Sequence, residues 1–185
     1  MAVNVLYTGY AVEIDGVKYR HHPNGGGLVA ETAEVAETAF VGSRAMVKGR
    51  AKVLERARIT GRACVGGGAF ISGNSEASED AVVLQQAKIT DRARIRDRAT
   101  VFENAEVTDC AEIFGSAMVY GNARVSGNAR ASGHVAIHDH AKVFENAWVF
   151  DEATVCGDAE VCGGAQVYGS ARVTGNQIVS TGEVR

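Results

Sequence analysis

Hydrophobic residues recur at every sixth position along most of the chain. An aliphatic or alanine residue stands at Val29 and at each sixth position as far as Val179, with no insertion or deletion. This gives 26 hexads between Gly27 and Gly182, and the position is Val or Ile in 24 of them. Ala precedes it by two residues in 22 hexads, and Gly (12) or an acidic residue (11) follows it by two. A period of six is not a multiple of 3.6, so the pattern argues against helices.

The spacing within a hexad predicts a short strand followed by a corner. Ala and the aliphatic residue are two apart, so both point to the same side of an extended segment, and their neighbours point outward. The Gly or acidic residue that follows permits the backbone to turn, because Gly and Asp tolerate positive φ. Three successive hexads would close one triangular coil. About nine such coils, stacked ~4.8 Å apart, would form an all-β rod.

Two segments, VYGNARVSGNARASG (119–133) and VFENAWVFDEATVCGDAEV (143–161), carry the pattern most clearly. They resemble the hexapeptide-repeat superfamily, which implies a single-stranded left-handed parallel β-helix. The left hand comes from the resemblance alone, since generic parallel crossovers are right-handed. The Gly or acid comes one position later than the small residue of the enzyme families. The sequence is therefore closer in appearance to the GNARV-type β-helix proteins of bacteria and phages.

The chain divides into a cap (1–26), the β-helix (27–182) and a short tail (183–185). Residues 10–14 and 17–20 flank Asp15-Gly16, which is a strong hairpin turn signal. A solenoid needs its open first coil covered, and we expect the hairpin to do this.

Positions three hexads apart share a face, and the three predicted faces differ in polarity. Between Met46 and Cys156, the outward positions of the first face carry one formal charge, Lys48. An apolar face this long is too extended to leave in water, unless the N-terminal hairpin covers it. The resemblance implies a parallel homotrimer. We therefore expect a self-association interface made by Met46, Val82, Leu84, Phe102, Met118, Tyr120 and His138.

Charge is segregated along the chain, although the total is only −3. Residues 1–43 have a net charge of −3, residues 44–98 of +6 and residues 99–185 of −6. A local basic belt favours a small anionic ligand over a long nucleic acid, and arginine forks suit phosphate oxygens. The expected ligand-binding residues are Arg58, Arg62, Arg94, Arg96, Arg98, Tyr120 and His134. The alternative is that these arginines form ordinary ion pairs with Glu76, Glu79, Asp80 and Asp97.

Catalytic chemistry has little support in the sequence. Hexapeptide acyltransferases bind acetyl-coenzyme A and use a histidine, for which the candidates here are His134, His138 and His140. The chain has no loop excursion within the repeat, no P-loop and no GxSxG motif. Related zinc enzymes need a histidine pair five residues apart, whereas the spacings here are four and two. We therefore expect no metal site, no cofactor and, on balance, no enzyme.

No apolar run approaches the ~20 residues of a membrane-spanning helix, and we expect no membrane partner. The four cysteines lack zinc spacing, which makes a reducing cytoplasm the expected location. Three functions stay open: a binding protein, an acyltransferase and a structural rod. Some phage proteins of this appearance are sponges that sequester cyclic nucleotide immune signals, so the resemblance favours an anti-defense binding protein.

Overall fold

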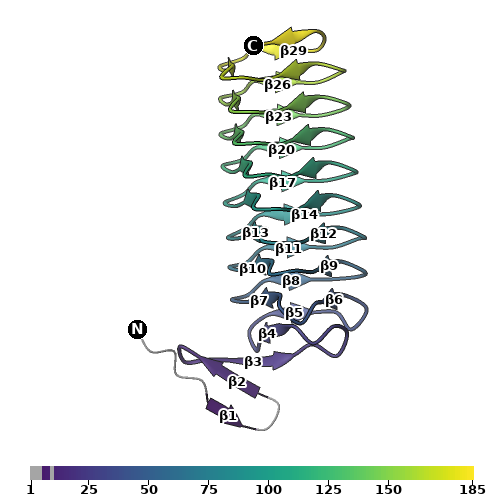
Figure 1. Ribbon diagram of the computed structural model, residues 1–185, viewed down its shortest axis with the longest axis vertical. Coiled ribbons are helices and arrows are strands. Elements are labelled where there is room, and N and C mark those ends of the chain that lie inside the picture. Colours follow the sequence, from purple (N-terminus) through teal and green to yellow (C-terminus); the bar gives the residue numbers. More distant parts are fainter. Residues whose placement is uncertain (1–5, 9–10) are drawn as a thin grey trace.

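The structure is a parallel β-solenoid, seen in a computed structural model that describes residues 6–8 and 11–185 (Figure 1). The chain rises coil by coil from the N-terminal cap to the C-terminus, and each coil contributes one strand to each of three sheets. Within the described residues, no helix is long and apolar enough to cross a membrane.

Each sheet forms one face of a triangular prism, and each face has nine solenoid strands. Face 1 comprises β4 (Leu28–Ala30), β7 (Met46–Val47), β10 (Cys64–Val65), β13 (Val82–Val83), β16 (Thr100–Val101), β19 (Met118–Val119), β22 (Ala136–Ile137), β25 (Thr154–Val155) and β28 (Arg172–Val173). Face 2 comprises β6 (Phe40–Val41), β9 (Arg58–Ile59), β12 (Glu76–Ala77), β15 (Arg94–Ile95), β18 (Glu112–Ile113), β21 (Arg130–Ala131), β24 (Trp148–Val149), β27 (Gln166–Val167) and β30 (Glu183–Val184). Face 3 comprises β5 (Glu34–Val35), β8 (Lys52–Val53), β11 (Phe70–Ile71), β14 (Lys88–Ile89), β17 (Glu106–Val107), β20 (Arg124–Val125), β23 (Lys142–Val143), β26 (Glu160–Val161) and β29 (Ile178–Val179).

Strands of one face pair in parallel with a register of three hexads, as the repeat pattern predicts. Val65 lies opposite Val83, for example, and the same offset holds up the stack. The last pair departs from it, because Val167 lies opposite Val184, which is one position short of three hexads. Face 2 therefore continues through Glu183–Val184, and the segment set apart as a tail contains a strand.

The core is a column of aliphatic residues with alanines at the corners. The inward Val and Ile positions from Val29 to Val173 are buried except for Val35, which is half-buried, and the alanines two residues before them are buried as well. Each buried aliphatic side chain contributes about 1.5–3 kcal/mol through apolar burial. Ser75 replaces one of the alanines and is also buried, and its hydroxyl donates to the carbonyl of Ser72 at 2.7 Å.

The corners form as the pattern predicts, with positive φ at the second residue after each aliphatic position from Gly49 to Gly175. The acidic residues at this position also make a contact that the sequence analysis missed. The Glu103 carboxylate accepts the Gly121 N–H of the next coil at 2.8 Å. The same contact to the following corner is made by Glu55, Glu79, Asp91, Asp97, Asp109, Asp139, Glu145 and Asp151, and by the Gln85 amide oxygen.

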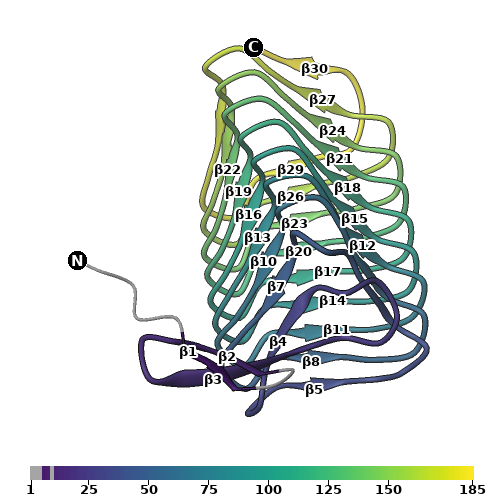
Figure 2. The same ribbon diagram turned by 60° about the horizontal axis from the view of Figure 1, so that its bottom comes forward.

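The cap is an antiparallel meander of β1 (Leu6–Thr8), β2 (Ala11–Ile14) and β3 (Val17–His21) (Figure 2). Asp15 and Gly16 both have positive φ, which confirms the predicted turn. Strand β3 pairs antiparallel with β4, so the described strands of the cap extend the sheet of face 1 past the first coil. Tyr19 is 6% exposed and belongs to the core cluster, where it fills the open end. Tyr10 lies outside the described residues.

Candidate functional site

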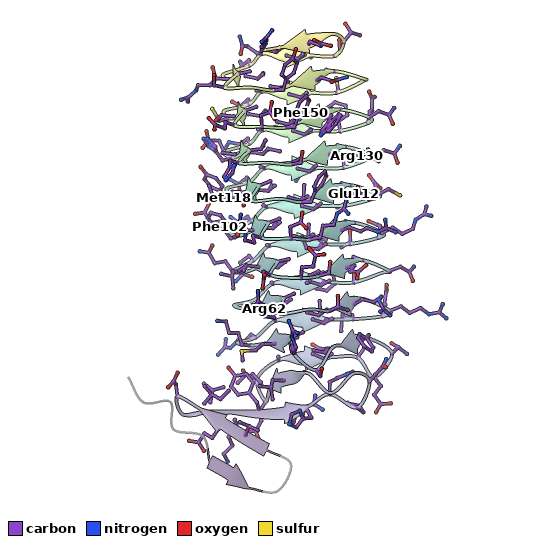
Figure 3. All side chains as sticks on the ribbon, in the orientation of Figure 1. Arg62, Phe102, Glu112, Met118, Arg130 and Phe150 are labelled. Carbon is purple, nitrogen blue, oxygen red and sulfur yellow. The ribbon has the colours of Figure 1, made fainter. Side chains whose placement is uncertain are left out.

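Face 1 presents the apolar surface that the sequence predicts. Its outward side chains are mostly half-buried by their neighbours in the coils above and below, and Met118 is the most exposed large apolar one among its solenoid strands, at 42%. Figure 3 places Met118 and Phe102 on one side of the rod and Glu112 and Arg130 on the other.

Aromatic rings stack along one edge of face 1, beside the corner that leads to face 3. The ring centroids of Phe102 and Tyr120 are 4.9 Å apart, with an angle of 9° between the planes. Tyr120 and His138 are also 4.9 Å apart, at 13°. Burial raises the pKa of the Tyr120 phenol, with smaller contributions from neighbouring acidic groups. Both faces of the Tyr120 ring are covered, so it offers its edge, and not a stacking platform, to a ligand.

Basic residues line the opposite edge of face 1, at the corner between faces 2 and 1. We call this column, which holds Arg44, Arg62, Asp80, Arg98, Ser116 and His134, the arginine corner. Arg62 binds Asp80 through both ends of its guanidinium, with Nε–Oδ1 at 2.6 Å and Nη2–Oδ2 at 2.7 Å. The hydrogen bond from Arg62 lowers the pKa of Asp80, and the charges of Arg62, Arg44 and Arg98 lower it further. Within the described part of the chain, Arg44 and Arg98 have no ion-pair partner.

On face 2 the charged side chains alternate in sign along one column. The order is Arg58, Glu76, Arg94, Glu112 and Arg130, set by the parallel register. Arg94 and Arg130 lie 3.3 and 3.8 Å from the carboxylate of Glu112. This part of the predicted site is therefore compensated by acidic neighbours. Its main acidic partner is Glu112, which was not among the expected pairs.

Arg96 lies on face 2 next to the arginine corner. Its Nη2 is 3.3 Å from Glu112, and its guanidinium covers the Phe114 ring at 4.6 Å from the centroid. Its Nε is buried and has no hydrogen-bond partner in the part of the chain that the structure describes. Arg58 makes a similar contact with Phe40, at 4.8 Å.

Glu79 and Asp97 occupy successive corners next to the arginine column, and both are held by corner contacts. Glu79 accepts the backbone N–H of Asp97 at 2.9 Å, and Asp97 accepts that of Gly115 at 2.7 Å. The contact between the two carboxyl groups raises the pKa of Glu79 and lowers that of Asp97. Among the described residues, neither of these acids forms an ion pair with an arginine.

The three candidate catalytic histidines lie in three different columns. His134 is exposed on the arginine corner, where it lines an open hollow with Glu152. His138 is half-buried on face 1, and its Nδ1 is 3.2 Å from Asp139. His140 lies on the corner between faces 1 and 3, with Nε2 3.3 Å from the Asn122 amide. One protomer thus brings His138 and His140 to either side of Asp139 but leaves His134 apart.

The structure divides the predicted binding residues into three groups. Arg62, Arg98 and His134 share the arginine corner, while Arg58, Arg94 and Arg96 lie on face 2. Tyr120 lies across face 1, at its far edge. Within one chain, only the first group forms a column that is basic and incompletely paired.

One family comparison matches part of the chain. The model of the YdcK beta solenoid repeat matches residues 113–133 and 165–181, which are runs of hexads within the solenoid. No curated protein matches the chain. The matched segments make up about a fifth of the sequence. The fold and this match together describe a β-solenoid protein, part of which is similar to the YdcK beta solenoid repeat.

Proposed function

We propose that this protein is a non-catalytic binding scaffold, which assembles as a homotrimer through face 1 and holds a small anionic ligand at the arginine corner. The observation that carries the proposal is the column of Arg44, Arg62 and Arg98 beside a face that carries one formal charge between Met46 and Cys156, with Asp80 as the one acidic residue of the column between Arg44 and His134. Asp80 neutralises Arg62, so Arg98 and Arg44 are the cations available to a ligand.

Self-association through face 1 is supported by its chemistry. Burying the surface between Met46 and Cys156 requires the desolvation of one charge, Lys48, which lies at an edge of the face. A second copy supplies a sheet of the same apolar character and the same strand spacing. A threefold arrangement would also bring the Tyr120 edge of one copy towards the arginine corner of the next.

The ligand class follows from guanidinium geometry. Arginine presents planar donors that match phosphate oxygens in pairs, and it keeps its charge at all physiological pH values. The GNARV-type proteins that the sequence resembles include phage sponges for cyclic nucleotides. We propose a ligand of this kind, a small cyclic nucleotide whose phosphates bind Arg98 at the border between two copies.

The assembly is tested by sedimentation of the full chain. We expect the wild-type protein to sediment as a trimer and Met118→Glu to sediment as a monomer, since the charge would lie within face 1. Trp148→Glu is the matched control, because Trp148 is similarly exposed (37%) but lies on face 2. A monomeric wild-type protein, or a trimer that Met118→Glu leaves intact, would contradict the interface.

The ligand site is tested by calorimetry with a panel of cyclic dinucleotides and trinucleotides, and with acetyl-coenzyme A as the contrasting probe. Arg98→Glu should abolish nucleotide binding. Arg92→Glu should retain it, because Arg92 is an exposed arginine on a different corner. If none of the anions binds the wild-type protein, the remaining interpretation is a structural rod. Binding of acetyl-coenzyme A alone, with transfer of its acetyl group, would support the acyltransferase interpretation instead.

A further inference from the structure

A histidine, a carboxylate and a thiol converge where face 1 meets the corner leading to face 3. His138 follows β22 and Cys156 follows β25, and these strands pair with Ile137 opposite Val155, so the two side chains are neighbours in one column. Asp139 occupies the adjoining corner, with a φ of 60°. One donor atom from each residue lies within 4.8 Å of the other two. We propose that His138, Asp139 and Cys156 form a binding site for a thiophilic divalent metal ion of the zinc type.

The spacing of the donors suits such an ion. The Nδ1 of His138 and the Oδ1 of Asp139 are 3.2 Å apart. Two ligands bound at 2.0–2.1 Å to a tetrahedral zinc ion are about 3.3 Å from each other. Nitrogen and oxygen therefore already have the separation that the ion requires. The Cys156 sulfur lies within 4.8 Å of both atoms, and a thiolate bound to the same ion would be about 3.6 Å from each.

Neighbouring groups hold two of the three ligands in place. The second carboxylate oxygen of Asp139 accepts the Gly157 N–H at 3.0 Å. The imidazole of His138 is stacked on Tyr120, which fixes the plane of the ring. Contacts of this kind orient metal ligands and reduce the entropy lost when the ion binds.

Within a single chain, exposure increases from the thiol towards the carboxylate. Cys156 is 8% exposed, whereas the side chains of His138 and Asp139 are 21% and 53% exposed. Three protein ligands leave the fourth tetrahedral position open to water or to an anionic ligand. The mixture of nitrogen, sulfur and oxygen favours Zn²⁺ over Mg²⁺ or Ca²⁺, which prefer oxygen. On binding, the thiol proton passes to solvent.

This site departs from the sequence-based expectation that the chain has no metal centre. That expectation considered the spacing between histidines, whereas two of the three donors here are a carboxylate and a thiol. Cys156 comes three hexads after His138, which is one full turn of the solenoid. All three donors come from one chain, so the site is complete in a single protomer.

Metal titrations of the full chain test this site. After metal is removed, the protein is titrated with Zn²⁺ in competition with a chromophoric chelator, which measures affinity, and separately with Co²⁺, which reports the ligands. We expect one ion per chain, a thiolate-to-cobalt charge-transfer band in the near-ultraviolet, and protection of Cys156 from alkylation. Cys156→Ser and Asp139→Asn should each weaken Zn²⁺ binding by about tenfold or more. Asn retains the positive φ at this corner, so the second variant tests the ligand without removing the turn.

Two controls separate this site from general thiol or imidazole binding. Cys162→Ser changes a cysteine at the same hexad position on face 3, and His140→Gln changes the neighbouring exposed histidine. Both should bind Zn²⁺ as the wild-type protein does. The proposal is overturned by one ion per three chains, by the absence of the charge-transfer band, or by folded Cys156→Ser and Asp139→Asn proteins that bind with unchanged affinity. The loss of binding in a control variant would also overturn it.

Discussion

Arg62 and Asp80 lie one coil apart on the arginine corner and form a two-point ion pair, with nitrogen–oxygen distances of 2.6 and 2.7 Å. This pair interrupts a column that would otherwise be basic from Arg44 to Arg98. Because Arg62 is engaged by Asp80, the pair determines which arginines on the corner are available to an anion. The titration of the Asp80 carboxyl group measures the electrostatic potential at this corner.

The carboxyl group of Asp80 should titrate below the ordinary aspartate range. The hydrogen bond from Arg62 is the main cause of its lowered pKa, so Arg62→Gln should move the titration midpoint upward. The stabilising effect of the pair is complete above the unfolded-state pKa and is lost as pH falls through the lowered folded-state pKa. Carboxyl carbon chemical shifts recorded against pH measure both midpoints. Identical midpoints in the two proteins would show that the pair does not form in solution.

The cap should depend on Tyr19. Replacing this core side chain with Ala removes the ring that fills the open end, and we expect a loss of about 3–5 kcal/mol in unfolding free energy. Val17→Ala is the control on the same strand, because Val17 is 39% exposed, and its effect should be about 0.5 kcal/mol. Urea unfolding, with amide exchange to locate the change in the first coils, measures both. Equal effects would mean that Tyr19 does not stabilise the first coil.

Gly27 should be intolerant of any side chain. A Cβ at this position would lie 2.4 Å from the carbonyl oxygen of Gly42 and 2.5 Å from the Val41 side chain. We expect Gly27→Ala to cost about 1–3 kcal/mol, because the neighbouring backbone must move. Gly164→Ala is the control, since a Cβ there meets no atom of the described residues within 4 Å. Thermal unfolding compares the variants, and a Gly27→Ala protein as stable as Gly164→Ala would contradict the close packing beneath the first coil.

The core-facing positions can be predicted from the sequence, because they recur at a fixed interval of six residues. A residue such as Ile95 has no alternative to the core once the hexad register is set, and the columns on each face follow by advancing three hexads at a time. The contacts between outward side chains depend instead on the direction in which each long side chain extends along its column. Arg94 lies within ion-pair distance of Glu112 in the next coil, and among the described residues it forms no such pair with Glu76 in the preceding one. The pattern permits both pairs equally.

The candidate site shows the same division. The repeat predicts that Arg62, Arg98 and His134 share one corner, because a corner position recurs with every third hexad, and the structure has them in that column. The approach of Asp139 to Cys156 was not predicted. It depends on the left-handed backbone at the corner, which turns a carboxylate towards the next coil. The acidic corner residues thus have a second role that the hexad consensus does not reveal.

Because the acidic corner residues accept a backbone N–H of the next coil, variants of Glu145 should differ in stability in a specific order. Its carboxylate accepts the Gly163 N–H of the next coil at 2.7 Å, from a corner with a φ of 61°. Glu145→Gln should be nearly neutral, because Gln85 makes the equivalent contact through its amide oxygen. Glu145→Ala keeps the strained φ and loses the acceptor, so we expect a loss of about 1 kcal/mol in unfolding free energy.

The exchange rate of the Gly163 amide proton measures this hydrogen bond directly in each variant. It should rise in Glu145→Ala and in Glu145→Gly, and stay slow in Glu145→Gln. Glycine relieves the strain at positive φ, so Glu145→Gly should recover part of the global stability while its Gly163 proton still exchanges rapidly. Glu152→Ala, an exposed residue one position past a corner, is the matched control and should change neither quantity. A slow Gly163 proton in Glu145→Ala would show that the carboxylate does not bind this N–H, and that acidic residues occupy the corners for their backbone conformation alone.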